Sequence, residues 1–381
     1  MKRVAVLGGG PAGAFAAERL AAGGLSTILV DENLAWEKPC GGGLTWKAWS
    51  QYPFLFHNAY PKKLVQRTYL RAGGRESASL DLTQPLLIYS RYDLNQLLLE
   101  RAQDAGATLE KSRVLQLERR GSGWIVRTRS GRIDADFCVV ATGARNGLRE
   151  TGTQWNAGDT MSSLGYFIPH QQDHVDLEFI PGLEGYIWIF PRQGHVSAGI
   201  AGKGKPASEL RSILQSYLAA KGIAVGDAPF FGHVIPSLEV EAWKRNRVAG
   251  DGWIAVGDAA GLVDPVTGEG LYYAMRSAEL ASDSILRLGL DAPSEYLNAV
   301  GREMFEDLAV GARLAKKLFL GKFLLSEVTT RMIQCMRRSP TILQVMQDLF
   351  AGTQGYVDLK PRLLASRGKV LRELAFGART D

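Results

Sequence analysis

The sequence predicts an α/β protein with a discontinuous Rossmann-type nucleotide-binding domain, an inserted mixed or antiparallel β-sheet domain and a helical C-terminal segment. Three observations predict this arrangement. A glycine-rich turn follows an apolar run at residues 2–7, and a second glycine-rich block occupies residues 252–261. Alternating aromatic segments fill residues 160–240, between these two blocks. A nucleotide-binding domain interrupted by a β-rich insertion accounts for all three.

The chain begins with a predicted βαβ unit. The apolar run at residues 2–7 is typical of a buried parallel strand, and Gly8, Gly10 and Gly13 follow it with G-x-G-x-x-G spacing. Gly8 permits the tight turn, Gly10 lets the backbone approach a pyrophosphate, and Gly13 allows the helix to pack on the strand. The turn therefore predicts a dinucleotide site.

An Ala-rich helix is expected next, from Ala12 to Ala22, directly after Pro11. Its N-terminal N–H groups would face the phosphates of the nucleotide. A second strand over residues 26–30 ends at Asp31 and Glu32. An acid about 20 residues after the turn is expected to bind a ribose hydroxyl, and Asp31 fits the strand end better than Glu32. An ordinary glycine-rich βα turn is the alternative.

The remaining elements follow from periodicity and turn residues. Residues 36–60 are expected to form a loop. The β-rich insertion, between residues 144 and 248, is expected to carry one helix. The predicted strands form a hairpin at 64–82, an antiparallel meander at 114–128 and 133–141, and a single strand at 253–256. The predicted helices lie at 91–105, 207–221 and 269–288, and the C-terminal helices are broken near Gly321, Pro340, Gly352 and Pro361.

These elements suggest three parts of the chain. Residues 1–65, 85–148 and 248–310 are expected to form the nucleotide-binding domain. Residues 66–84 and 149–247 form the substrate domain. Residues 311–381 form the helical C-terminal segment.

Composition narrows the class of protein. The 381 residues are 46% hydrophobic and 22% charged, which is ordinary for a globular protein. Because the first strand follows Met1 directly, a signal peptide is not expected, and no run of about 18 apolar residues predicts a spanning helix. Cys40, Cys138 and Cys335 form neither a disulfide framework nor a metal pair, and the five histidines lack ligand spacing. We therefore expect a cytoplasmic protein without a metal.

Positive charge concentrates at the C-terminus. Residues 311–381 hold thirteen Lys or Arg and five Asp or Glu, a net charge of +8, whereas the whole chain has +6. A basic, amphipathic segment can face anionic lipid, as in a peripheral membrane contact, or a phosphorylated substrate. The alternative is a solvated helical face. Nucleic acid is not expected as a partner, because no recognisable nucleic-acid-binding module accompanies the charge.

Four stretches resemble the para-hydroxybenzoate hydroxylase-type flavoproteins and, within them, the geranylgeranyl reductase group. They cover much of residues 1–275. They are the Gly8–Gly13 turn with Asp31, the Lys38-Pro39-Cys40-Gly41-Gly42-Gly43 loop, the Tyr186-x-Trp188-x-Phe190-Pro191 motif followed by Gly199, and the Gly257-Asp258-x-x-Gly261 block continuing to Gly270.

The resemblance implies an FAD cofactor and further contacts to it. It implies that Asp258, after Gly257, contacts the ribityl–pyrophosphate region. It implies that residues 265–270 lie along the flavin ring and that Arg91 meets FAD. A helix N-cap is the alternative role for Asp258.

The loop from Pro265 to Gly270 has a further expected role. Backbone N–H groups of Gly268, Glu269 and Gly270 would stabilise reduced flavin from the start of the following helix.

The Cys40 loop and the aromatic motif are the candidate substrate site. Cys40 either borders the flavin, where it positions substrate or relays a proton, or is a small packing residue. Tyr186, Trp188 and Phe190 alternate and so share one strand face, which Pro191 ends. This face is either the wall of an apolar substrate cavity or part of a packed core. Cys138 and Cys335 are assigned to packing.

The sequence departs from the family pattern at two places. Thr142 stands where many relatives carry Asp, which weakens the case for a standard NADPH-using hydroxylase. Ala201 replaces the second glycine of the motif that follows the aromatic residues. The aromatic motif also overlaps the W-x-W-x-I-P segment of flavin-dependent halogenases, with Tyr186 and Phe190 replacing two of its residues.

The resemblance favours an FAD enzyme that reduces C=C bonds of an isoprenoid or lipid-like apolar substrate by hydride transfer from flavin N5. Tyr186 and Cys40 are the candidate proton donors. The alternative is a flavin-dependent monooxygenase or halogenase acting through a C4a-oxygen adduct on an aromatic small molecule or a protein residue. A non-catalytic FAD-binding partner is a third possibility. No second G-x-G-x-x-G is present, so electrons are expected from an external donor, either NAD(P)H or a reductase or ferredoxin.

Overall fold

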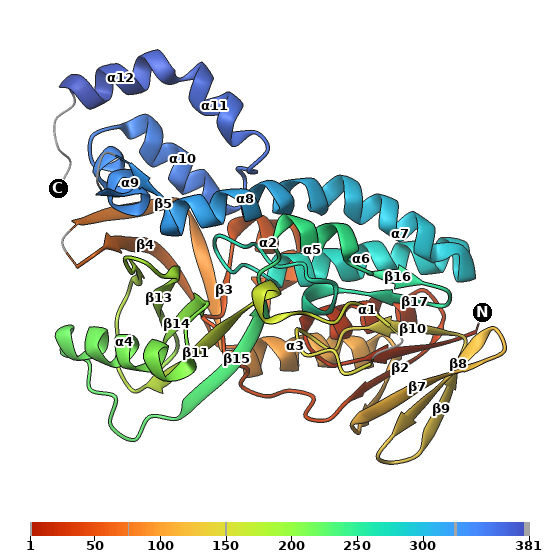
Figure 1. The fold of residues 1–381 in the computed structure, drawn as a ribbon. Helices are drawn as coiled ribbons and strands as arrows, with labels where there is room; N and C mark the ends of the chain where they lie inside the picture. The colour runs from red at the N-terminus through yellow and green to blue at the C-terminus, as the bar shows by residue number, and fades with distance from the viewer. Residues whose placement is uncertain (1, 75, 149–150, 324–325, 377–381) are drawn as a thin grey trace. The chain divides into compact units, whose positions relative to one another are not determined.

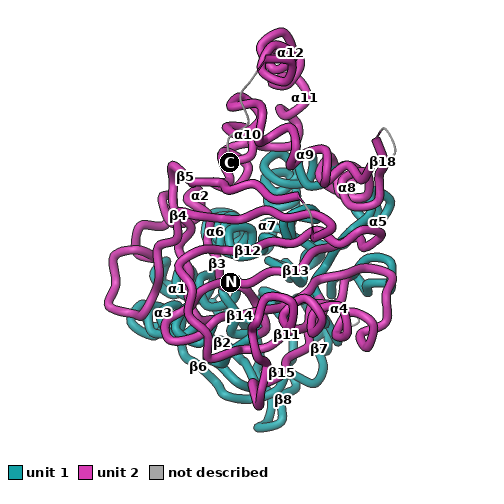
Figure 2. The backbone as a smooth tube through the Cα atoms, turned by 90° about the vertical axis from the view of Figure 1, so that its left-hand side faces the viewer, with its two compact units in different colours: residues 1–38, 91–160, 235–309 teal, residues 39–90, 161–234, 310–381 magenta. Residues whose placement is uncertain are grey.

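The computed structural model describes residues 2–74, 76–148, 151–323 and 326–376 (Figure 1). Figure 2 colours its two compact units, each built from three stretches of chain. Unit 1 comprises residues 1–38, 91–160 and 235–309, and unit 2 comprises residues 39–90, 161–234 and 310–381. The expected α/β class with a helical C-terminal part is confirmed. The units divide the chain differently from the expected domains, because residues 39–65, 85–90 and the C-terminal segment all group with unit 2.

Unit 1 contains a six-stranded sheet with the order β16-β17-β10-β1-β2-β6. All neighbouring pairs are parallel except β16 with β17. Its core strands are short apolar runs with almost no exposed residue, as expected for a sheet covered on both faces. The strands are β1 (Arg3–Leu7), β2 (Ser26–Asp31), β6 (Thr108–Lys111), β10 (Phe137–Val140), β16 (Ala249–Gly250) and β17 (Trp253–Ala255).

The predicted antiparallel meander is shorter than expected. It consists of β7 (Val114–Arg120), β8 (Gly123–Thr128) and β9 (Arg132–Ala135), while β10 leaves it and pairs in parallel with β1. The break falls at Asp136, whose carboxylate accepts the Lys2 and Arg3 N–H groups at 2.6 and 3.0 Å. Strand β9 alternates between exposed and buried residues, whereas β10 is buried throughout. A continuous apolar strand belongs in the doubly covered sheet.

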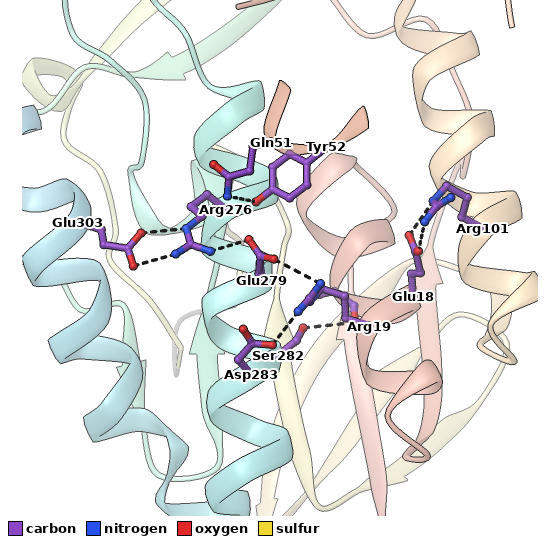
Figure 3. A network of polar contacts seen from close by, with 11 residues as sticks. Glu18, Arg19, Gln51, Tyr52, Arg101, Arg276, Glu279, Ser282, Asp283 and Glu303 are labelled. Carbon is purple, nitrogen blue, oxygen red and sulfur yellow. Dashed lines mark hydrogen bonds and ion pairs between the residues drawn. The ribbon is translucent and has the colours of Figure 1, made fainter. Parts of the chain in front are cut away.

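Ion pairs join the helices that pack beside this sheet (Figure 3). Arg19 of α1 contacts Glu279 and Asp283 of α6 at 3.4 and 2.8 Å, and Arg101 of α3 pairs with Glu18 of α1. Exposed pairs of this kind add little stability individually, but here several share partners. The helices of unit 1 are α1 (Pro11–Ala22), α3 (Arg91–Asp104), α5 (Val240–Arg245), α6 (Leu271–Leu288) and α7 (Ala292–Val300), and α8 (Glu306–Leu320) continues into unit 2.

Unit 2 contains an eight-stranded sheet with the order β15-β11-β14-β13-β12-β4-β5-β3. The predicted hairpin is confirmed as β4 and β5, which pair on either side of Gly73 and Gly74. β12 and β4 are parallel, and the other registers described are antiparallel. The strands are β3 (Gly43–Leu44), β4 (Lys62–Ala72), β5 (Glu76–Tyr89), β11 (Thr160–Ile168), β12 (Val175–Phe179), β13 (Glu184–Pro191), β14 (Val196–Lys203) and β15 (Phe230–Pro236).

The helices of unit 2 differ from the prediction in two places. The expected loop at residues 36–60 contains α2 (Trp46–Gln51) and a short 3₁₀ turn. Pro361 does not break a helix but lies in the first turn of α11, where proline is tolerated. The other helices are α4 (Ala207–Ala220), α9 (Val328–Met336), α10 (Pro340–Ala351), α11 (Leu359–Ala365) and α12 (Arg367–Phe376). None of the helices in the described ranges is both long and apolar enough to cross a membrane.

Candidate functional site

The first glycine turn lies at the carboxyl end of β1 and is tightly packed against backbone. Gly8 has φ +114°, and a Cβ there would lie 2.3 Å from the Ala141 carbonyl oxygen, at the end of β10. A Cβ on Gly13 would lie 1.9 Å from the Gly8 carbonyl oxygen. Both positions therefore require glycine. In the sheet order, β2 lies on one side of β1 and β17 lies on the other side of β10, so the turn lies where the strand order reverses. Ligands of doubly wound folds bind at such a point.

Gly10 differs from its neighbours because space is open around it. A Cβ on Gly10 would meet no described atom within 4 Å. Gly10 is also the N-cap of α1, with no side chain capping it, and Pro11 and Ala12 begin the helix. An uncapped helix N-terminus beside open space can accept an anion such as a pyrophosphate.

The two acids at the end of β2 have different partners. The Asp31 carboxylate accepts the Gly9 N–H at 2.7 Å and the N–H groups of Asn33 and Leu34 at 2.8 and 2.7 Å. Glu32 instead pairs with Arg129 at 2.9 Å. Asp31 therefore lies at the glycine turn, and Glu32 does not join it. The backbone contacts of Asp31 leave lone pairs that a ribose hydroxyl can use, because each carboxylate oxygen accepts more than one hydrogen bond.

The second glycine-rich block lies against the first. Gly257 follows β17 with φ +60°, and a Cβ there would lie 3.0 Å from the Ala12 Cβ at the start of α1. The structure thus brings together the two sequence blocks that predicted the nucleotide site. Asp258 is not a helix N-cap: Val256 caps the 3₁₀ turn and Gly270 caps α6.

Asp258 has a partner that sequence reasoning missed. Its carboxylate lies 3.2 Å from the Lys38 Nζ, and both side chains are largely buried. The sequence predicted Lys38 only as a member of the Cys40 loop, without a role at the nucleotide site. Spacing along the chain could not reveal the contact, because the two residues are 220 positions apart. A carboxylate that pairs with a lysine beside the glycine turns is suited to organising hydroxyl groups of a ligand.

The loop before α6 is tied by its own side chains. The Asp264 carboxylate accepts the N–H groups of Val266 and Thr267 at 2.8 and 3.1 Å. The Gly268 N–H donates to the Asp264 carbonyl oxygen at 2.9 Å, and the Glu269 N–H donates to the Thr267 hydroxyl at 3.2 Å.

This bonding limits the role expected for the loop between Pro265 and Gly270. Two of its three expected N–H donors are already engaged, which leaves Gly270 as the available one. The helix also starts at Leu271 rather than Glu269, and the Glu269 carboxylate accepts the Tyr272 N–H in the first turn at 2.7 Å. Burial raises the pKa of the Tyr272 phenol to about 12, so it stays protonated at neutral pH.

Arg91 begins α3 and is only 3% exposed. Its Nη2 lies 3.4 Å from the Asn95 side chain, and its backbone N–H donates to Glu37. Its Nε is buried and has no hydrogen-bond partner among the described residues. Because a buried, unpaired donor is costly, this group fits a ligand that supplies the acceptor.

These observations fit a bound FAD. The turn at Gly8 to Gly13, Asp31, Asp258 and the unpaired Nε of Arg91 are the residues of unit 1 that would hold it. FAD, when bound, supplies redox chemistry at its isoalloxazine ring, while the protein supplies binding, orientation and electrostatics.

In unit 2, the Cys40 loop is held by an arginine that the sequence analysis did not single out. Arg192 is almost fully buried, and its guanidinium donates to the Cys40 carbonyl oxygen at 2.5 Å and to the Gly41 carbonyl oxygen at 3.4 Å. Ser197 also donates to the Cys40 carbonyl oxygen, at 2.9 Å. The position of Arg192, directly after the aromatic motif, was the signal that could have identified it.

The Cys40 side chain itself is half-buried. Its Sγ accepts the Gly42 N–H at 3.3 Å. Cys138, in contrast, is fully buried in β10, and burial raises the pKa of its thiol far above the usual range. Cys138 is therefore an inert packing residue.

The aromatic motif forms part of β13. The two isoleucines between its aromatic residues, Ile187 and Ile189, are fully buried in the core that packs with α4. Tyr186, Trp188 and Phe190 alternate with them, so they face the other side of the sheet.

The aromatic face extends beyond the motif. Tyr186 stacks on Phe319 of α8 with ring centroids 6.4 Å apart, and Trp188 lies edge-on to Tyr186 at the same distance. Phe179 of β12 packs against both Tyr186 and Phe319. The Trp188 Nε1 is buried without a hydrogen-bond partner in the described ranges. Pro191 is buried at the end of the strand.

Phe190 connects the aromatic motif with the Cys40 loop. A Cβ on Gly41 or Gly43 would lie 3.0 or 2.7 Å from its ring. The structure thus brings the two candidate substrate motifs of unit 2 together.

Several known proteins are similar to this chain. A family model described as lycopene cyclase protein matches residues 3–187. Menaquinone reductase of Mycolicibacterium smegmatis is 28% identical over 353 residues, which cover 84% of this chain and 85% of the relative. The chloroplastic geranylgeranyl diphosphate reductase of Nicotiana tabacum is 26% identical over 321 residues, covering 74% and 66%.

Solved structures show the same fold. A geranylgeranyl bacteriochlorophyll reductase-like protein of Thermoplasma acidophilum has a TM-score of 0.79 with 21% identity, covering 96% of this chain and 99% of that one. A halogenase in complex with FAD has a TM-score of 0.67 with 16% identity, covering 98% and 85%. The fold and the nucleotide site therefore define an FAD-dependent oxidoreductase. Within that class, the chain is similar to geranylgeranyl diphosphate reductases and menaquinone reductases.

Proposed function

We propose that this protein reduces C=C bonds of an apolar, isoprenoid or lipid-like substrate. The observation that carries the proposal is the aromatic face of unit 2, where Phe179, Tyr186, Trp188 and Phe319 lie together beside the Cys40 loop. Phe179, Trp188 and Phe319 are only 9%, 5% and 3% exposed, so this face is an apolar, water-excluding environment with few polar groups, as an isoprenoid chain requires. Relatives named for reduction of geranylgeranyl diphosphate and of menaquinone support this substrate class.

The residues of unit 2 would bind and orient the substrate and exclude water. Bound FAD would supply the hydride, from N5 of its reduced form. Arg192 fixes the backbone of the Cys40 loop, and the unpaired Trp188 N–H can donate to a polar end of the substrate. A proton must reach the second carbon of the double bond, and Tyr186 and Cys40 are the candidate donors. Electrons would come from an external donor, NAD(P)H or a reductase or ferredoxin.

Anaerobic rapid mixing tests the reaction. The FAD-loaded protein is reduced with dithionite and mixed with geranylgeranyl lipids without oxygen. The proposal is supported if the flavin is reoxidised faster with the lipids than without them and if a product with fewer C=C bonds forms. In a parallel experiment the reduced protein is mixed with oxygen alone. A long-lived absorbing transient, without any response to the lipids, would contradict the reductase and favour the monooxygenase or halogenase alternative.

A pair of variants distinguishes the two proton donors. Because general acids typically contribute 10²–10⁴-fold, Tyr186→Phe should slow product formation by about that factor if the phenol is the donor. Cys40→Ala should then retain most activity. The converse result would assign the proton to the thiol. Rates of product formation close to that of the wild type in both variants would exclude both residues as the proton donor.

A further inference from the structure

The last two helices of the described chain leave large apolar side chains in solvent. Neither α11 nor α12 buries a single residue. Leu364 is 53% exposed, Leu371 66% and Phe376 88%. Within unit 2, both views show these helices at the far end of the C-terminal segment, beyond α10 (Figures 1 and 2). Exposed apolar groups gathered on two consecutive helices indicate an interaction surface.

Contacts with α10 determine which side of α12 is exposed. The Glu373 carboxylate accepts the Ser339 hydroxyl and the Thr341 N–H and hydroxyl at the start of α10. Val370 and Leu374 lie on the same side of the helix as Glu373 and are half-buried. Leu371 and Ala375, one turn apart, therefore point away from the protein. The acid of this helix is turned inward, and the apolar face is turned outward.

The outward face is also strongly basic. Arg367, Lys369 and Arg372 of α12 and Lys360 of α11 are all exposed. Arg362 is excluded from this group, because it is half-buried and pairs with Asp348 at 2.7 Å. Lys369 lies 3.9 Å from the Glu373 carboxylate but is 68% exposed, so it is kept. The exposed face of α12 thus combines leucine and phenylalanine with three cations, as in helices that lie in a membrane interface.

We propose that α11 and α12 form a docking surface for a bilayer that contains anionic phospholipid. The cations would meet lipid phosphates, while Leu364, Leu371 and Phe376 would enter the acyl boundary. A second copy of the chain fits less well, because a symmetric contact would bring these cations against one another. The surface goes beyond the reductase activity and can be tested without turnover.

Vesicle flotation of the full-length, FAD-loaded protein tests the proposal. One set of vesicles is phosphatidylcholine, and the other is an equal mixture with phosphatidylglycerol. We expect partitioning onto the mixed vesicles that weakens as salt is raised, because screening shortens the range of the attraction. Leu371→Asp with Phe376→Asp should also abolish partitioning, because the apolar contribution is lost.

Charge reversal with a matched control makes the test specific. Arg367→Glu with Lys369→Glu and Arg372→Glu should lower partitioning at least about tenfold, since each cation near the surface contributes to binding. Lys111→Glu with Arg132→Glu and Lys244→Glu changes the net charge equally at exposed positions of unit 1 and should have little effect. Flavin content and circular dichroism verify folding in every variant. The proposal would be overturned if the wild type did not partition onto the vesicles, or if both charge variants lost partitioning equally. A dimer that Leu371→Asp abolishes would also overturn it.

Discussion

The protein contains two runs of three glycines whose surroundings differ. In the first, Gly8 to Gly10, a Cβ on Gly8 would meet the backbone of Ala141, directly after β10, and a Cβ on Gly9 would meet the Asp31 side chain of β2. In the second, Gly41 to Gly43, they come from the ring of Phe190 and from the Tyr89 carbonyl oxygen, 2.0 Å from a Cβ on Gly42. The first run leaves one glycine facing open space, whereas the outer glycines of the second face an aromatic ring.

The two runs therefore differ in what determines their structure. The first is determined mostly by residues of its own motif, and the second by residues distant in the sequence. In the first turn, the contacts of Gly13 with Gly8 and of Asp31 with Gly9 lie within one βαβ unit, so most of its geometry accompanies its sequence, and Ala141 reaches Gly8 from the end of β10. The second depends on Phe190 and Arg192, which reach it from β13 and the residue after it. Substitutions in the two regions should therefore fail in different ways.

Gly13→Ala should have the largest effect. The added Cβ would lie 1.9 Å from the Gly8 carbonyl oxygen, and neither backbone segment can move without disrupting β1 or α1. We expect a loss of more than about 3 kcal/mol in the free energy of unfolding. Urea denaturation of the apoprotein measures it. A midpoint equal to that of the wild type would show that the helix and turn are not in close contact.

Arg192→Met should loosen the second loop alone. Two carbonyl groups would lose a charged donor, which we expect to cost about 2 kcal/mol. Hydrogen exchange should accelerate at residues 41–43 and remain unchanged at residues 8–13. Equal acceleration in both runs would mean that the variant destabilises the whole protein rather than the loop.

Gly43→Ala should be milder because its neighbour is a side chain. The new methyl group would meet the Phe190 ring at 2.7 Å, and overpacking of this kind typically costs about 1–3 kcal/mol. Phe190→Leu should recover part of that loss in a double-mutant cycle. The absence of any coupling between the two substitutions would argue against this contact.

Gly10→Ala should leave folding almost unchanged. Its backbone has φ −69° and ψ −179°, which alanine adopts readily, and no described atom lies near the new methyl group. If the open space receives the pyrophosphate, FAD affinity should fall about tenfold or more, equivalent to about 1.4 kcal/mol. Fluorescence titration of the apoprotein with FAD measures it. An unchanged affinity would move the pyrophosphate away from Gly10.

The sequence by itself determined the elements whose causes are local. The Gly8–Gly13 turn, the helix at Arg91 and the hairpin at Gly73 and Gly74 were all predicted, because backbone conformation and apolar periodicity act over a few residues. The resemblance to geranylgeranyl reductases was also evident from short motifs. The positions of Asp31 beside Gly9 and of Tyr186, Trp188 and Phe190 along one strand followed from spacing.

Only the tertiary structure decided the contacts between distant segments. The Lys38–Asp258 pair, the Arg192 contact to the Cys40 loop and the departure of β10 from the meander each join residues more than 100 positions apart. The engagement of the Gly268 and Glu269 N–H groups and the start of α6 at Leu271 also required coordinates, because competing acceptors lie within the same loop. Such pairings depend on strand order and burial, which local propensities do not encode.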